Sequence, residues 1–181
     1  MLHRDFIRDL PQKVGSTVVV RGWIFRRRTA GKLCFIEVRD GSGVVQAVVK
    51  KGAVGDAEFD AADKVRLESS VAVTGTVRSA PRAPGGVELS VTAFEVVAAC
   101  IDDFPLGKKE HGIGFLMEER HLYLRSRRPT AVLRIRAEVV RALREWLDGH
   151  GFTHVAAPIF TPAAAEGTAN LFKVDYFGEP A

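Results

Sequence analysis

Long apolar runs and cysteine pairs are both missing from this sequence, and each absence narrows the class of protein. No apolar stretch approaches the roughly 20 residues that a helix needs to cross a bilayer. The first residues also lack the basic-then-apolar pattern of a secretory signal. Among 181 residues only Cys34 and Cys100 are cysteines, and they form no Cys-x-x-Cys pair. We therefore expect a cytoplasmic protein with no membrane partner and with reduced thiols.

Metal and nucleotide fingerprints are absent as well. The five histidines show no metal-ligand spacing, so no metal site is expected in this chain. Gly112-Ile113-Gly114 is not a nucleotide-binding fingerprint, because no strand leads into it and a third glycine is missing. Hydrophobic residues make up 46% of the chain and charged residues 27%, which is ordinary for a folded domain and argues against disorder.

Positive charge is concentrated near the start of the chain. The formal net charge is +4, whereas residues 1–50 alone hold ten basic and four acidic side chains. Three of the basic residues are consecutive: Arg26, Arg27 and Arg28. A locally positive face on a small domain indicates a polyanionic partner, while the plainer interpretation is a solvated run of charge.

Residues 17–98 are rich in valine, threonine and glycine and are typical of a β-barrel. The order of five strands, with a short helix at Glu58–Arg66 between the third and the fourth, predicts an OB fold, which binds single-stranded oligonucleotides or oligosaccharides. SH3-like barrels also have five strands and remain an alternative. The expected strands are Thr17–Phe25, Leu33–Arg39, Val44–Lys50, Val71–Arg78 and Val87–Val97.

Alternation within the second and third strands predicts a mixed outer surface. In the second strand Cys34, Ile36 and Val38 share an apolar face, so Phe35 lies on the other face. The hairpin then brings Phe35 and Gln46 onto one surface. An exposed ring stacks on an unpaired base, an amide reads a base edge, and the nearby arginines hold phosphates. The alternative is that Phe35 is simply a half-buried barrel aromatic.

The last third of the sequence is expected to be helical after an irregular hinge. Residues 105–128 show no clear period, whereas the helix expected at Thr130–Gly149 carries a narrow apolar stripe. A strand is expected at Phe152–Ala157. The stripe consists of Val132, Ile135, Val139, Leu143 and Trp146.

The stretches 20–28, 35–40 and 43–46 resemble the anticodon-binding OB domain of a particular family. That family is the aspartyl, asparaginyl and lysyl group of class II aminoacyl-tRNA synthetases. The resemblance implies that Phe35 stacks on the middle uridine of the anticodon and that Gln46 hydrogen-bonds to it. It also implies that Arg26, Arg27 and Arg28 contact the anticodon loop, so tRNA is the expected partner.

The second half of the chain is similar to the same family. Residues 151–159 resemble class II motif 1, which implies a homodimer interface that includes Pro158. Residues 161–178 look most like asparaginyl-tRNA synthetases, with archaeal-type aspartyl enzymes close behind. The resemblance implies that Glu166 meets the α-ammonium of the amino acid, where an anion facing a cation is physically sensible.

Motifs 2 and 3 of class II enzymes, which hold ATP and Mg²⁺, do not occur in the sequence. We therefore expect an OB domain at residues 1–104, a hinge at 105–128 and the α+β start of a catalytic domain at 129–181. These residues alone are expected to bind no cofactor and to be inactive, as the N-terminal portion of an enzyme that ligates asparagine to tRNA. The alternatives are an aspartyl enzyme, including a non-discriminating one, and a stand-alone OB module that binds RNA. A sugar-binding OB protein is also an alternative, although a neutral ligand gives the arginine run no purpose.

Overall fold

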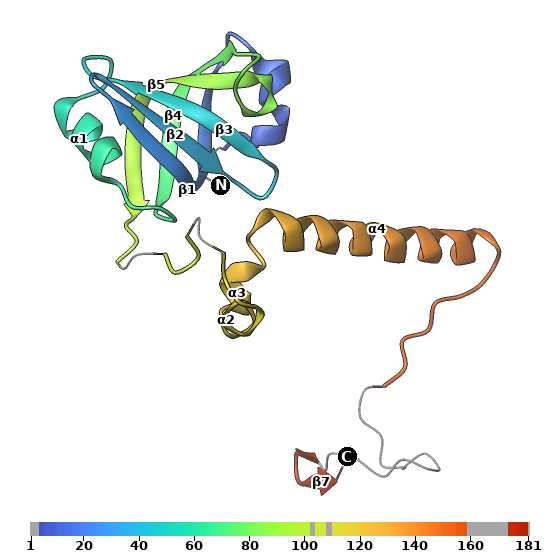
Figure 1. Ribbon diagram of the computed structural model, residues 1–181. Helices are drawn as coiled ribbons and strands as arrows, with labels where there is room; N and C mark the ends of the chain where they lie inside the picture. Colours follow the sequence, from blue (N-terminus) through green and yellow to red (C-terminus); the bar gives the residue numbers. More distant parts are fainter. Residues whose placement is uncertain (1–3, 102–103, 108–109, 159–173, 181) are drawn as a thin grey trace. The chain divides into compact units, whose positions relative to one another are not determined.

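The computed structural model describes residues 4–101, 104–107, 110–158 and 174–180 (Figure 1). The chain divides into two compact units, Met1–Lys109 and Glu110–Ala181. The boundary between them falls inside the expected hinge.

The first unit is a closed five-stranded barrel. The strands pair in the order β1-β2-β3-β5-β4, and β3 and β5 are parallel while every other neighbouring pair is antiparallel. A helix, α1 (Asp56–Lys64), lies between β3 and β4 in the chain. This confirms the predicted OB fold. The strands are β1 (Thr17–Ala30), β2 (Leu33–Arg39), β3 (Val44–Lys50), β4 (Ser70–Ser79) and β5 (Val87–Ala98), with a 3-10 turn, η2 (Pro84–Gly86), before β5.

Alternate residues of the barrel strands point into a closed core. In β2 the side chains of Cys34, Ile36 and Val38 are fully buried, as the sequence pattern predicts, and the residues between them are half-buried. The Cys34 thiol approaches the carbonyl oxygen of Ala62 in α1, at 3.4 Å, so the helix packs against this strand. Burial raises the pKa of Cys34 above its ordinary value.

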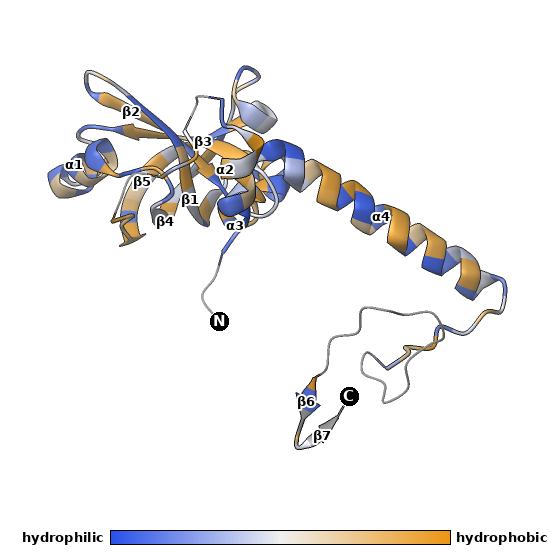
Figure 2. Cartoon of the chain, turned by 60° about the horizontal axis from the view of Figure 1, so that its bottom comes forward, coloured by the Kyte–Doolittle hydropathy of each residue, from blue (hydrophilic) through white to orange (hydrophobic). Residues whose placement is uncertain are grey.

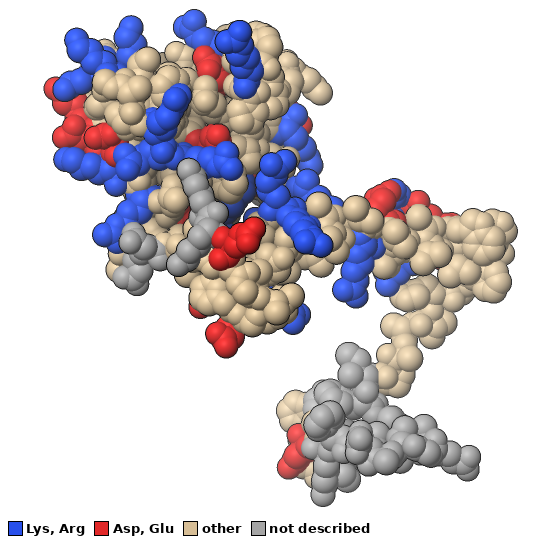
Figure 3. All heavy atoms as spheres, viewed as in Figure 1, with Lys and Arg blue, Asp and Glu red and all other residues tan. Residues whose placement is uncertain are grey.

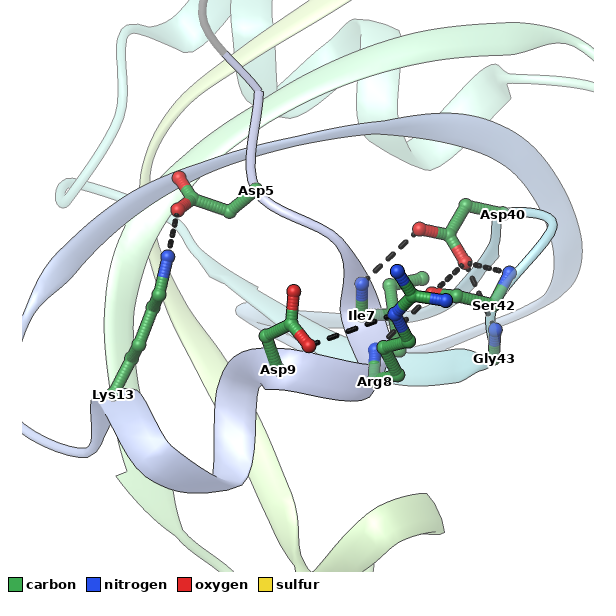
Figure 4. A network of polar contacts seen from close by, with 8 residues as sticks. All are labelled: Asp5, Ile7, Arg8, Asp9, Lys13, Asp40, Ser42 and Gly43. Carbon is green, nitrogen blue, oxygen red and sulfur yellow. Dashed lines mark hydrogen bonds and ion pairs between the residues drawn. The ribbon is translucent and has the colours of Figure 1, made fainter.

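A 3-10 helix near the N-terminus, η1 (Ile7–Lys13), is tied to the barrel by two carboxylates (Figure 4). Asp40 accepts hydrogen bonds from the backbone N–H groups of Ile7, at 3.1 Å, and of Gly43, at 2.8 Å. Asp5 is buried and accepts from the backbone N–H of Val19 in β1 at 3.0 Å and from the Nζ of Lys13 at 2.5 Å, which raises the pKa of that lysine. The segment before β1 is therefore held by specific partners and belongs to the first unit.

The second unit begins with two short helices, α2 (Ile113–Glu118) and α3 (Arg120–Tyr123), where the sequence indicated an irregular hinge. Helices of one or two turns are too short to show a hydrophobic period, which explains the difference. They are followed by the long helix α4 (Arg127–Gly149), which begins three residues before the expected start. A small hairpin, β6 (Asp175–Tyr176) with β7 (Glu179–Pro180), ends the described chain.

Helix α4 keeps the predicted apolar stripe exposed (Figure 2). On another side, Arg141 forms ion pairs with Glu138 and Glu145, which lower the pKa of Glu138 and raise that of Arg141. Among the described helices none is long and apolar enough to span a membrane. The stripe residues are between about half and two-thirds exposed: Val132, Ile135, Val139, Leu143 and Trp146.

The strand expected at Phe152–Ala157 is not present, because residues 152–158 have no regular secondary structure. A strand is defined by hydrogen bonds to a neighbouring strand. In the described part of the chain the segment 152–158 pairs with none, since β6 and β7 pair only with each other. An apolar alternating sequence was therefore not sufficient to predict a strand here.

Candidate nucleic-acid interface

A row of five side chains crosses the outer face of the barrel, one from each strand. The strand registers pair Arg26 with Glu37, Glu37 with Gln46, Gln46 with Glu88, and Glu88 with Arg78. Partners in register lie on the same face of a sheet. The row therefore has an amide at its centre, a carboxylate on each side of that amide, and a guanidinium at each end.

A second row lies beside the first, two residues away along each strand, and carries the aromatic side chain. Its members in β1, β2 and β3 are Arg28, Phe35 and Val48, which are partners in register. Phe35 is half-buried and lies on the same face as Gln46, as the alternation predicts. The Arg28 guanidinium lies over the Phe35 ring, 4.9 Å from its centroid. This face thus offers an aromatic ring, an amide and cations within two adjacent rows.

A β-bulge decides which arginines reach this face. The β1–β2 register shifts between Ile24 and Arg26, so that Phe25 has no partner in β2. If Phe25 were paired with a residue of β2, Arg27 would lie opposite Phe35. Arg26 and Arg28 would then lie opposite the inward-facing residues of β2. The extra residue reverses that phase and places Arg26 and Arg28 on the outer face, which is a known effect of bulges.

The three arginines therefore have different surroundings. Arg26 lies 3.8 Å from Glu37, while Arg27 points to the opposite side of β1, where its Nη1 is 3.6 Å from Asp63. Among the described residues Arg28 has no carboxylate within 4.0 Å, and its contact is with the Phe35 ring. The structure thus brings two of the three predicted arginines together with Phe35 and Gln46, and separates Arg27 from them.

The Gln46 amide is oriented by a residue that sequence reasoning missed. Its Nε2 donates to the Oε2 of Glu88 at 3.0 Å. Since a carboxylate only accepts hydrogen bonds, the amide nitrogen must point toward Glu88, and the Oε1 acceptor remains for another partner. Glu88 lies 42 residues beyond Gln46 and reaches it only through the parallel β3–β5 pairing. Arg78, at the end of the same row, was also missed, because it joins the row only through its pairing with Glu88.

Charge over the barrel is mixed rather than uniformly positive (Figure 3). Lys and Arg side chains lie interspersed with acidic ones, and the row from Arg26 to Arg78 likewise contains both signs. Cations at the margins attract phosphates, while carboxylates near the centre repel them and accept hydrogen bonds from base donors. The arrangement suits a nucleic-acid loop whose bases contact the centre of the row and whose backbone lies toward the arginines at its ends.

Two predicted site residues lie outside this face. Pro158 is exposed at the end of the irregular segment 152–158. Glu166 lies outside the described residues. Their predicted roles, at a dimer interface and at the amino acid, are not tested by this geometry.

Two family models match the chain, and together they cover both units. The model of the OB-fold nucleic acid binding domain, named for the tRNA anticodon, matches residues 18–97. The model of class II tRNA synthetases of the D, K and N type matches residues 113–179. The first unit thus contains an OB-fold nucleic acid binding domain, and the second matches part of a class II tRNA synthetase domain of the aspartyl, lysyl and asparaginyl type.

Curated relatives narrow this likeness within the group of synthetases. The chain is 50% identical over 173 residues to the asparagine–tRNA ligase of Sorangium cellulosum, covering 96% of this chain and 39% of that protein. It is 48% identical over 179 residues to the asparagine–tRNA ligase of Thermus thermophilus, covering 98% of this chain and 41% of that protein. The chain thus spans about two-fifths of the length of these synthetases.

Solved synthetase structures share its fold. The asparaginyl-tRNA synthetase from Pyrococcus horikoshii, solved with asparaginyl-adenylate, superposes with a TM-score of 0.89 at 36% identity, over 99% of this chain and 42% of that one. The asparaginyl-tRNA synthetase from Entamoeba histolytica, also with asparaginyl-adenylate, gives a TM-score of 0.73 at 29% identity, over 92% of this chain and 39% of that one.

Proposed function

We propose that the outer face of this barrel binds the anticodon loop of a tRNA, with Phe35 stacking on the middle base and Gln46 reading its edge. The observation that carries the proposal is the placement of Phe35, Gln46, Arg26 and Arg28 on one face. Base–aromatic stacking contributes about 1–3 kcal/mol per base, and arginines beside it hold the backbone. Arg27, on the other side of β1, takes no direct part in reading the base.

Orientation of the Gln46 amide favours uridine as that base. The Oε1 atom, left over after Nε2 donates to Glu88, accepts from the N3–H of uracil. Cytosine has an acceptor at N3, so the Oε1 of Gln46 faces a second acceptor and no hydrogen bond forms between them. Glu88 is therefore a positioning residue for base choice.

Binding itself is tested by titrating a labelled anticodon stem–loop into the 181-residue chain. Saturable binding, displaced by the same unlabelled hairpin but not by one whose loop is replaced with a different sequence, supports the proposal. No displacement by either hairpin, or equal displacement by both, argues against anticodon binding. A neutral oligosaccharide as competitor tests the sugar-binding alternative in the same assay.

Glu88→Gln should reduce the preference for uridine over cytidine at the middle position. The substituted amide both donates and accepts, so Gln46 is free to turn either end toward the RNA. We expect uridine to keep most of its affinity, and the ratio between uridine and cytidine hairpins to fall about tenfold. Competition between the two hairpins measures that ratio, and an unchanged ratio contradicts the role of Glu88.

For the whole protein we propose the ligation of asparagine to its tRNA in the cytoplasm. Support comes from the 45–50% identity to asparagine–tRNA ligases over nearly all of this chain. An aspartyl enzyme remains the second candidate, because the two anticodons share two positions. We expect the third to be read by the loop Ser79–Gly86. Charging of tRNA with asparagine and with aspartate by the whole protein decides between the two amino acids.

ATP and Mg²⁺ are generally used by class II synthetases. Among the described residues no group of three or more His, Cys, Asp or Glu side chains is placed to hold a metal ion. The described residues therefore do not fit the metal. Glu166 remains our proposed partner for the α-ammonium of the amino acid.

Homodimerisation through α4 and Pro158 is the remaining part of the proposal. Exposed apolar side chains in one stripe favour burial against another surface. Leu143→Glu, which places a charge in that stripe, should convert the dimeric whole protein to a monomer in sedimentation experiments. Ala137→Glu, on the opposite side of the helix, is the matched control and should leave the dimer intact. A dimer in both variants excludes the stripe from the interface.

A further inference from the structure

We propose that Asp63, on α1, is a positioning residue for RNA binding, because it fastens the end of β1 and so fixes which arginines face the RNA. This inference rests on the proposed function of the outer face. Asp63 itself lies on the other side of β1 from Phe35, next to the inward-phased residues Arg27 and Thr29. Its effect on RNA is therefore indirect.

Two contacts join Asp63 to β1. The Thr29 hydroxyl donates to its Oδ1 at 2.6 Å, and the Arg27 Nη1 lies 3.6 Å from the same oxygen. Both partners belong to the last residues of β1, which are exposed along Arg26–Ala30. A projecting strand end of this kind is the part of a barrel that is most readily displaced.

Helix α1 is itself packed against the barrel, so Asp63 has a fixed position. We call its two contacts, with Arg27 and Thr29, the latch. Phe59 and Ala62 are buried against the core, and the Ala62 carbonyl accepts from the Cys34 thiol at 3.4 Å. Cys34 is the register partner of Thr29, so the two contacts of α1 lie on neighbouring strands of one hairpin. Figure 1 shows α1 beside that end of the barrel.

The bulge and the latch both determine which side chains of β1 face outward. The bulge at Phe25 sets the phase in which Arg26 and Arg28 face outward, and Asp63 holds the alternate residues, Arg27 and Thr29, on the opposite side. Without the latch the strand end must be ordered when RNA binds, and the cost of that ordering appears as lost affinity.

Simple electrostatics predicts the opposite sign, and this makes the proposal testable. Asp63→Ala removes a negative charge from a protein that binds a polyanion, so long-range attraction alone predicts tighter binding. The latch predicts that binding of the anticodon stem–loop by the full chain weakens about two- to tenfold, the size expected for one lost hydrogen bond. Asp60→Ala, on the same helix and paired only with Lys64 among the described residues, is the matched control and should not weaken binding.

Two further variants separate positioning from general destabilisation. Thr29→Val removes the 2.6 Å hydrogen bond and leaves every charge in place, so it should also weaken binding. In a chain that already carries Arg26→Ala and Arg28→Ala, Asp63→Ala should have no further effect, because the groups it positions are gone. Equal effects with and without the arginines, or unchanged or tighter binding by both Asp63→Ala and Thr29→Val, overturn the proposal.

Failure of the latch is distinguishable from failure of the proposed function. If Phe35→Ala weakens binding while Asp63→Ala and Thr29→Val do not, the outer face binds RNA and the latch is wrong. If Phe35→Ala and the double arginine variant bind as the parent does, the proposed function is wrong and the latch falls with it.

Discussion

Phe35→Ala should weaken binding of the anticodon stem–loop by about 1–3 kcal/mol, which is a rise in Kd of roughly fivefold to 150-fold. The ring is the aromatic surface that the outer face presents beside Gln46, and alanine offers nothing on which a base can stack. Loss of the ring also leaves Arg28 without the group over which it lies. Fluorescence anisotropy at one fixed salt concentration measures the change.

The matched control is Phe35→Tyr, which keeps a flat ring of the same breadth and should bind nearly as tightly as the parent. Because Phe35 is only half-buried, the alanine variant should remain folded, and a thermal melt checks this. Parental affinity in a folded Phe35→Ala chain removes the stacking role. Equal losses in the alanine and tyrosine variants point to a packing role instead.

Arg28→Ala should lower RNA affinity for every loop sequence and flatten its dependence on salt. Among the described residues Arg28 lacks a carboxylate neighbour, whereas Arg26 and Arg27 each have one. Its charge is thus the least neutralised of the three. Each phosphate contact to a single strand contributes about 0.7 to the slope of log K against log salt, so the slope should fall by about that amount.

Lys64→Ala is the control for total charge, since it removes one cation from α1, away from the outer face. It should leave the salt slope close to that of the parent. Arg26→Ala should have a smaller effect than Arg28→Ala, because Arg26 is partly neutralised by Glu37. If the slope is the same for Arg28→Ala and the parent, Arg28 makes no phosphate contact.

Local alternation was enough to predict the two strands that carry the site. In Leu33–Arg39 and Val44–Lys50 one set of alternate residues is wholly apolar, and every charged or amide side chain falls in the other set, so the buried set and the outer set follow from the strand period. A tight turn between the strands then fixes the register. The common face of Phe35 and Gln46 is therefore a consequence of sequence alone.

The phase of the arginine run could not be predicted in the same way. Three identical side chains carry no alternation, and the bulge at Phe25 depends on how β1 pairs with both β2 and β4. Glu88 was missed for a related reason, since parallel pairing of β3 with β5 is set by closure of the barrel rather than by a turn. Features that depend on distant pairing need the structure.

The most direct test of the anticodon-binding face compares two hairpins that differ at one base. The full chain is titrated with an anticodon stem–loop that has uridine at the middle position, and with the same hairpin carrying cytidine there. The oriented amide of Gln46 predicts that cytidine binds about tenfold or more weakly, within the 1–3 kcal/mol expected for a well-placed base contact. Equal affinity for the two hairpins would contradict the assignment of Phe35 and Gln46 to the middle base.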